Sequence, residues 1–367
     1  MVKKALFLAL LLAMAAFPLA ACGGGNDAAQ PGGDAAAEDP ENADGDAGGA
    51  SADLGSPVDL TLGHPYPTSD YRAVAMDYFA GQASELSDGN ITITTFPSQT
   101  LTTSQDALKS VANGVADMAT GALSFNVSEV PALAPLDIQG IYDPDSFWET
   151  YEIVRPTLDK ILETQGQMSL IMFDESESIF YLNKSNQKDV HAPADIAGLR
   201  LRDHGMWIGK SISAWGASPM TIMPADLTVA LERGTVDGGY TGWGFAYAYR
   251  CHESAPYITF TGIAKSTWAP VTVNLDLFNG LSQSQRDIIL KAAQLAEDKA
   301  KELLEEDKAR FLAEVETLGG TVYEMSKEET QVFVDAAAPL IEEARGSSGE
   351  LGNELIDALL SAPSQYR

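Results

Sequence analysis

The sequence is short of basic residues, and this shortage narrows the partners that the protein can have. Its 367 residues include 23 lysines and arginines against 52 aspartates and glutamates, which gives a formal net charge of −29. A protein that binds nucleic acid needs basic patches to neutralise phosphates, so this charge argues against a nucleic-acid partner. The same charge disfavours electrostatic adhesion to anionic lipid.

Cysteine is almost absent as well, and its scarcity excludes a disulfide framework. The chain has two cysteines, Cys22 and Cys251, and the first lies in a segment that we expect to be processed. The mature fold then retains a single thiol, which cannot form an internal disulfide. We interpret Cys251 as a packed side chain rather than a nucleophile.

Several patterns that mark enzymes and metal sites are missing from the sequence. It contains no phosphate loop of the type G-x-x-x-x-G-K, no nucleophile elbow G-x-S-x-G and no cysteine pair with zinc spacing. Its four histidines are scattered along the chain. We therefore expect no enzymatic activity, no cofactor and no metal, with an exported hydrolase as the alternative from the enzyme class.

The N-terminus carries the most specific local pattern. Lys3 and Lys4 precede an apolar run at residues 5–16, which is too short for a transmembrane helix and is typical of a signal peptide. The segment ends Leu-Ala-Ala-Cys at Cys22, which resembles the lipobox of bacterial lipoproteins. The resemblance implies that residues 1–22 are a lipoprotein signal peptide and that Cys22 becomes lipidated. A chance cysteine after an ordinary cleaved signal is the alternative.

The next segment, residues 23–55, is rich in Gly, Ala, Asp, Glu and Pro and has almost no large apolar residue. Such a composition cannot bury enough surface to fold, so we predict a disordered tether. The folded domain then takes residues 56–367, in which no stretch is long and apolar enough to span a membrane. We expect a protein that lies outside the cytoplasm, in the cell envelope, and contacts the membrane through its lipid anchor only.

The folded part alternates between strand and helix patterns. Residues 58–62 and 91–95 alternate as strands, and a helix is predicted after Ser69 or Asp70. The same order recurs after residue 165, so we predict an α/β fold of two lobes, each built on a mostly parallel sheet. The first lobe takes residues 56–178 and 268–300, and the second takes residues 179–267 and 301–367.

Two predicted helices have apolar faces that bear on the arrangement of the lobes. The helix after Asp70 is expected to bury the face formed by Tyr71, Val74, Ala75, Tyr78 and Phe79. Residues 284–318 predict a helix about 50 Å long, which is more than one lobe needs. It either braces both lobes or forms a dimerising coiled coil, and its many alanines favour bracing.

The densest group of motifs lies between residues 194 and 238. It runs through Gly-Leu-Arg-Leu-Arg at 198–202, Trp-Gly-Ala-Ser-Pro at 215–219, Met-Pro at 223–224 and Ala-Leu-Glu-Arg-Gly-Thr-Val-Asp-Gly at 230–238. In this order, the motifs resemble the solute-binding component of tripartite ATP-independent periplasmic (TRAP) transporters, the C4-dicarboxylate-binding type. The resemblance runs from about residue 61 to the end of the long helix.

This resemblance implies a periplasmic-binding-protein-like fold, with a ligand cleft between the lobes and a long bracing helix. It also implies that the protein binds a small organic acid and hands it to a small and a large membrane permease subunit. The family's carboxylate-binding arginine maps onto Arg202, and a guanidinium fork matches a carboxylate well. An ion pair at the surface or between the lobes is the alternative role for Arg202.

Two positions depart from the pattern of the family. Many relatives carry a second arginine upstream of the first, where this sequence has Phe180, and an asparagine where it has Thr241. The loss of the second arginine shifts our expectation from doubly charged acids to a monocarboxylate with an apolar or aromatic body.

Aromatic side chains near Arg202 and after the Asp-Gly turn can stack on a ligand, with Trp243 in a presumed loop as the first candidate. Polar residues at strand ends of the first lobe can complete the site, and a carboxylate there would favour a ligand amine or hydroxyl. A lipoprotein that binds its ligand for signalling stays open as an alternative function. The predicted ligand-binding residues are Arg202, Thr241, Trp243, Tyr240, Trp207, His64, Tyr66, Phe125, Glu175 and Phe180.

Overall fold

The computed structural model describes residues 54–366. The predicted signal peptide, the lipidation site at Cys22 and residues 23–53 of the predicted tether lie outside the described residues. The last two tether residues already contact the folded part, because the Leu54 carbonyl accepts a hydrogen bond from Ser282 and the Gly55 carbonyl accepts one from Asn90.

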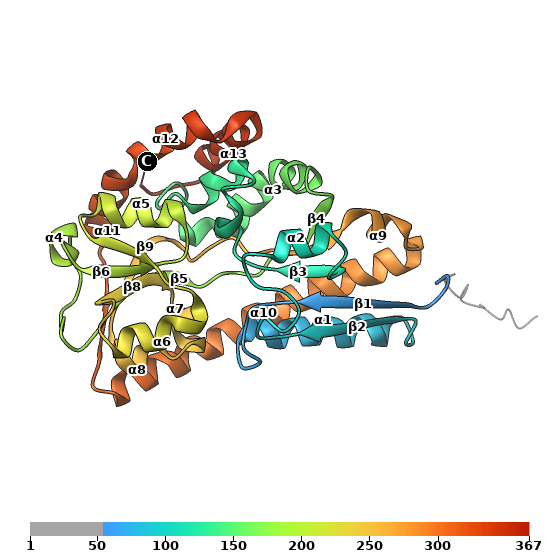
Figure 1. The fold of residues 1–367 in the computed structure, drawn as a ribbon, viewed down its shortest axis with the longest axis horizontal. Helices are drawn as coiled ribbons and strands as arrows, with labels where there is room; N and C mark the ends of the chain where they lie inside the picture. The colour runs from blue at the N-terminus through green and yellow to red at the C-terminus, as the bar shows by residue number, and fades with distance from the viewer. Residues whose placement is uncertain (1–53, 367) are drawn as a thin grey trace, which may run out of the picture. The chain divides into compact units, whose positions relative to one another are not determined.

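The described chain is built on two separate β-sheets (Figure 1). The first has five strands and the second has six. The order in the first sheet is β2 (Ile91–Phe96), β1 (Val58–Gly63), β3 (Met118–Thr120), β10 (Val271–Asn274) and β4 (Gln167–Ile171). The order in the second is β11 (Thr321–Glu324), β9 (Tyr257–Lys265), β5 (Glu177–Leu182), β8 (Gly238–Gly242), β6 (Arg200–Asp203) and β7 (Ser218–Thr221).

Both sheets are mixed, so the prediction of mostly parallel sheets missed their antiparallel pairs: two of four neighbouring pairs are parallel in the first sheet and three of five in the second. The strand β10 is antiparallel to β3 and β4, and β5 is antiparallel to β8 and β9. The reason is that the chain passes from the first sheet to the second through β4 and β5, and returns through β9 and β10. These two passes lie side by side in opposite directions, whereas strands linked by helices within one sheet pair in parallel.

Helices and short 3₁₀ turns cover the sheets. They are α1 (Tyr71–Leu86), α2 (Ala107–Ala112), η1 (Leu123–Asn126), η2 (Pro131–Asp137), η3 (Pro144–Ser146), α3 (Phe147–Glu163), α4 (Pro193–Ile196), α5 (Met206–Ala214), α6 (Pro224–Glu232), α7 (Trp243–Ala248), α8 (Cys251–Ser254), α9 (Leu275–Gly280), α10 (Gln283–Thr317), α11 (Lys327–Ala337), α12 (Pro339–Ser347) and α13 (Gly349–Ser361).

The long helix α10 has 35 residues and runs past elements of both sheets (Figure 1). It contacts α1 and β4 on the side of the first sheet, and α7 and β11 on the side of the second. Its apolar stripe, which includes Ile289, Ala296, Leu304 and Phe311, is buried within this chain. The prediction of a bracing helix is therefore confirmed, since the stripe that a coiled coil would need is already covered.

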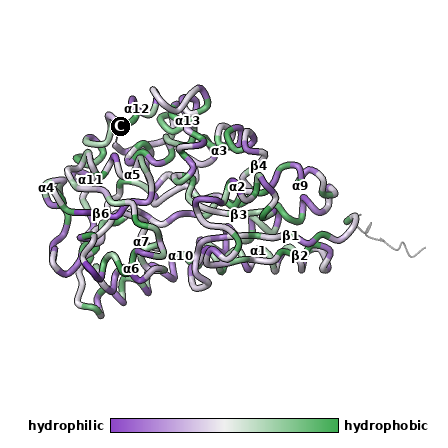
Figure 2. The backbone as a smooth tube through the Cα atoms, in the orientation of Figure 1, coloured by the Kyte–Doolittle hydropathy of each residue, from purple (hydrophilic) through white to green (hydrophobic). Residues whose placement is uncertain are grey.

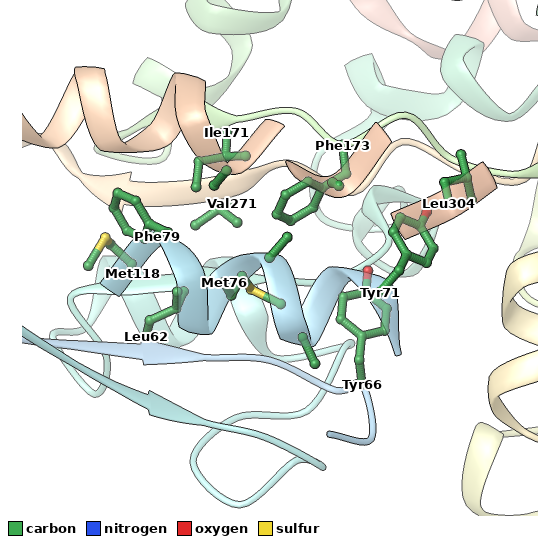
Figure 3. Close-up of a cluster of buried hydrophobic side chains, with 14 of the residues drawn as sticks. Leu62, Tyr66, Tyr71, Met76, Phe79, Met118, Ile171, Phe173, Val271 and Leu304 are labelled. Carbon is green, nitrogen blue, oxygen red and sulfur yellow. The ribbon is translucent and has the colours of Figure 1, made fainter. Parts of the chain in front are cut away.

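The helix α1 begins where the sequence predicted, and its buried face was predicted in part. Asp70 caps it by accepting a hydrogen bond from the Arg72 backbone at 2.9 Å. Tyr71, Ala75 and Phe79 are buried as predicted, whereas Val74 and Tyr78 are exposed and Arg72 and Met76 are buried in their place. The buried face packs against α10 and the first sheet, as Figure 3 shows for Met76 and Phe79 beside Ile171, Val271 and other apolar side chains.

The C-terminal helices return to the first half of the chain. α13 packs against α3 and η2, with Leu355, Ile356 and Leu359 buried there. The predicted division gave residues 301–367 to the second lobe, and this packing ties α13 to elements of the first. That the two lobes move relative to each other stays a prediction.

Within residues 54–366, no helix combines the length and the apolar character that a membrane crossing requires. Figure 2 shows hydrophilic and hydrophobic residues interleaved along the chain.

Candidate ligand-binding site

A small cavity of about 40 Å³ lies between the two sheets. Both sheets contribute walls to the cavity. Segments that follow strands of the first sheet supply Tyr66, Arg72, Ser104, Ala122 and Phe125. Strands of the second sheet, and the segments that directly follow them, supply Arg202, His204, Thr241, Phe245, Ser266 and Thr267. The free space is small, so this arrangement of the walls suits a compact ligand.

Arg202 on β6 supplies the cavity with a buried positive charge. The side chain is 1% exposed, its Nε donates to the Ile222 carbonyl at 3.1 Å, and its guanidinium lies over the Phe245 ring at 4.7 Å. Its Nη1 is buried without a hydrogen-bond partner, and no carboxylate among residues 54–366 forms an ion pair with it. A buried charge without a counter-ion is costly, so this group is suited to an anionic ligand.

Arg72 is the second arginine of the cavity, and its charge is already balanced. Its Nη2 lies 2.7 Å from Asp70 Oδ2, and its Nη1 lies 2.7 Å from Glu175 Oε2. Burial alone lowers the pKa of Arg72, but the two carboxylates raise it well above its ordinary value. Burial raises the pKa of Glu175, and Arg72 opposes that rise. The guanidinium also covers the Tyr66 ring at 3.8 Å, so this triad is a preformed wall of the cavity.

The structure brings several predicted residues to the cavity. Tyr66, Phe125, Arg202 and Thr241 line it, and Glu175 lies one hydrogen bond behind it, through Arg72. His64 does not line the cavity, but its ring stacks on Tyr66 with centroids 6.0 Å apart. Burial lowers the pKa of His64 to about 4, so this ring is neutral near pH 7.

Other predicted residues lie in the packed core instead. Tyr240 and Phe180 pack together with ring centroids 5.0 Å apart, because alternate residues of β8 face opposite ways and Thr241 takes the cavity side. Trp207 is buried in a separate apolar cluster beneath Lys210. Trp243 stacks on Phe311 of α10. It begins a helix rather than lying in the presumed loop, and Phe245 reaches the cavity in its place.

Arg72, His204 and Phe245 also line the cavity, although they were not among the predicted residues. Arg72 shares a helical face with Met76 and Phe79, and a basic residue on a buried face is a signal that could have been used. His204 directly follows the strand that carries Arg202, and this nearness is a weaker signal.

A close contact joins the two walls beside the cavity. Ser124 of η1 donates a hydrogen bond to the His204 carbonyl at 3.2 Å, and the next residue is Gly205. A Cβ atom at Gly205 would lie 2.8 Å from the Cβ of Ser124, which is closer than such atoms approach. Glycine is therefore needed here for the walls to meet.

We expect Gly205→Ala to weaken the affinity for a bound acid about tenfold, because overpacking a contact costs about 1–3 kcal/mol and 1.4 kcal/mol is tenfold. Titration calorimetry measures the affinity. Adding Ser124→Gly to the same chain removes the clashing Cβ and also the hydrogen bond to the His204 carbonyl, so it should restore only part of the loss. An unchanged affinity in Gly205→Ala would show that this contact is not part of the bound state.

The cavity lies between two α/β halves and carries a buried arginine, and the helix α10 packs against both halves. This arrangement is typical of a two-lobed solute-binding protein. The comparison with known families agrees. The chain belongs to the family of bacterial extracellular solute-binding proteins, family 7 (DctP), whose model matches residues 62–347.

Individual relatives are distant. The chain is 28% identical to the uncharacterized protein y4mM of Sinorhizobium fredii, over 79% of this chain and 53% of that one, so it spans about half of that relative. It is 24% identical to the ectoine-binding periplasmic protein TeaA of Halomonas elongata, over 80% of this chain and 87% of TeaA. A TRAP periplasmic solute-binding protein from Roseobacter denitrificans, solved with bound β-D-glucuronate, has the same fold with a TM-score of 0.76. It is 22% identical, and the match covers 83% of this chain and all of that one.

Proposed function

We propose that the protein captures a small organic monocarboxylate outside the cytoplasm and delivers it to the small and large membrane subunits of a TRAP-type transporter. The observation that carries the proposal is Arg202, a buried guanidinium in the cavity whose Nη1 has no hydrogen-bond partner among residues 54–366. Membership of the solute-binding family supports a role in capture, and the relatives named for ectoine and for β-D-glucuronate support a small polar or acidic ligand.

The charge of the cavity favours one carboxylate over two. Arg72 is matched by Asp70 and Glu175, so the positive charge of Arg202 is the one left for a ligand among the residues that line the cavity. A second carboxylate would have to enter beside the Arg72 triad, which already carries two acidic groups. The aromatic side chains of Tyr66, Phe125 and Phe245 line the cavity and suit the apolar body of the acid.

We further propose that Cys22 anchors the protein through lipid, on the strength of the Leu-Ala-Ala-Cys motif. The two chains of a diacylglyceryl group are enough for stable anchoring. Mass spectrometry of the mature N-terminus tests this, and an unmodified residue there would contradict it.

A thermal-shift screen of the purified protein tests the proposed ligand class. The panel contains monocarboxylic, dicarboxylic and aromatic acids, amino acids and neutral sugars. A ligand at a hundred times its dissociation constant stabilises the folded state by about 2.7 kcal/mol, which raises the melting temperature by several degrees. We expect monocarboxylates to give the largest shift. If neutral or cationic compounds shift the melting temperature and no acid does, the carboxylate proposal fails.

A further inference from the structure

The side chain of His204 is a buried polar group of the cavity that carboxylate binding leaves without a role. It lines the cavity and is 5% exposed. It follows the end of β6, two residues after Arg202, and both residues line the cavity. A carboxylate held by Arg202 therefore brings its neighbouring atoms close to this ring.

The hydrogen bonds of the ring identify its tautomer. His204 Nε2 lies 3.1 Å from the Ser266 carbonyl oxygen. A carbonyl oxygen only accepts, so Nε2 carries the hydrogen and donates it. Burial, with a contribution from Arg202, lowers the pKa of His204 to about 3, so the ring is neutral near pH 7. In a neutral ring whose Nε2 holds the proton, Nδ1 presents a lone pair.

Among residues 54–366, no group donates a hydrogen bond to that lone pair. His204 Nδ1 is buried without a hydrogen-bond partner, as are Arg202 Nη1 and Thr267 Oγ1 on the same wall. The residues that line the cavity thus include an unsatisfied donor at Arg202 and an unsatisfied acceptor at His204. Since buried polar groups are normally paired, a ligand that satisfies both is favoured over one that satisfies only the first.

We propose that His204 determines specificity: its Nδ1 accepts a hydrogen bond from a hydroxyl or N–H group that the ligand carries close to its carboxylate. This inference rests on the proposed function, because it takes Arg202 as the carboxylate partner. The ligand class narrows to hydroxy acids, hydroxylated sugar acids and acids with a ring or chain N–H. An acid with a ketone oxygen at that place is disfavoured, because two lone pairs would face each other.

Matched acids test the class directly. Titration calorimetry compares lactate with pyruvate and propionate, mandelate with phenylglyoxylate and phenylacetate, pyroglutamate with its N-methyl derivative, and D-gluconate with 2-deoxy-D-gluconate. We expect the donor-bearing member of the set that binds to be about tenfold to a hundredfold tighter than its partners. Equal affinity within the pairs overturns the inference and leaves the proposed function standing. If no acid in any set binds, the proposed function fails and this inference fails with it.

Two variants distinguish the proposed role of His204 Nδ1 as a hydrogen-bond acceptor from a purely structural role of the ring. His204→Gln keeps an amide donor where Nε2 meets the Ser266 carbonyl but removes the acceptor at the Nδ1 position. His204→Asn keeps an amide oxygen near the Nδ1 position. We expect the preference for the donor-bearing acid to disappear in His204→Gln and to survive in part in His204→Asn. If both variants weaken both members of a pair equally, the ring only supports the wall, and the assignment of specificity to Nδ1 is overturned.

Discussion

Replacing Arg202 with alanine is expected to weaken the binding of a monocarboxylate by at least about a hundredfold. The variant leaves the bound carboxylate in a buried site without its partner, which typically costs several kcal/mol, and each 1.4 kcal/mol is tenfold. The stability of the ligand-free protein should fall much less, because Arg202 forms no ion pair with a carboxylate among residues 54–366. Calorimetric titration and urea unfolding measure the two effects separately.

Arg200 provides a matched control on the same strand. It is exposed, and it pairs with Asp237 at 2.8 Å at the surface of the protein. Arg200→Ala removes the same side chain and charge, but an exposed pair contributes only about 0–1 kcal/mol, and it does not touch the cavity. Binding in Arg200→Ala should match the wild type. If Arg202→Ala also binds normally, the carboxylate site lies elsewhere.

The second large effect concerns folding rather than binding. Asp70→Ala is expected to lower the free energy of unfolding by about 3–5 kcal/mol, because it leaves Arg72 buried with one of its two carboxylates missing. The Arg72 side chain is 3% exposed, and Asp70 accepts from its Nε and Nη2 and from its backbone. Urea unfolding monitored by circular dichroism measures the loss.

Glu354→Ala is the control for this prediction. Glu354 pairs with Lys160 at 2.6 Å, and both side chains are about half exposed. Such a pair contributes at most about 1 kcal/mol, so its removal should hardly move the unfolding curve. A loss of the same size in Asp70→Ala and Glu354→Ala would mean that the Arg72 triad contributes no more than a surface ion pair.

The elements of the fold were predictable because each shows a local pattern. Alternation in β1 and β2, the cap at Asp70 and the apolar stripe of α10 depend on residues a few positions apart. The sense of the strands was not predictable in this way. The antiparallel pairing of β5 with β9 arises from the two crossings between the sheets, which join segments far apart in the sequence.

In the candidate site, too, local sequence predicted some residues, whereas others depend on contacts between distant segments. Arg202 could be singled out from the motif around it, whereas the role of Arg72 depends on Glu175, which lies 103 residues further along the chain. Trp243, the first candidate for stacking on a ligand, lies away from the cavity for a geometric reason. Trp243 and Phe245 are two residues apart on α7, so they point about 200° apart around the helix. Because residue 243 was predicted to lie in a loop, the direction of its side chain could not be derived from a helical period. Trp243 therefore became the candidate, although it faces α10.

The contact between Ser124 and the His204 carbonyl has a consequence for how long a captured acid stays. Its cavity has walls from both halves, and the predicted separation of the halves would break this contact. The rate of that separation would then limit how fast a captured acid leaves. A membrane partner that binds and separates the two halves would release the bound acid without competing for Arg202. Release would then depend on a movement of the protein rather than on displacement of the carboxylate.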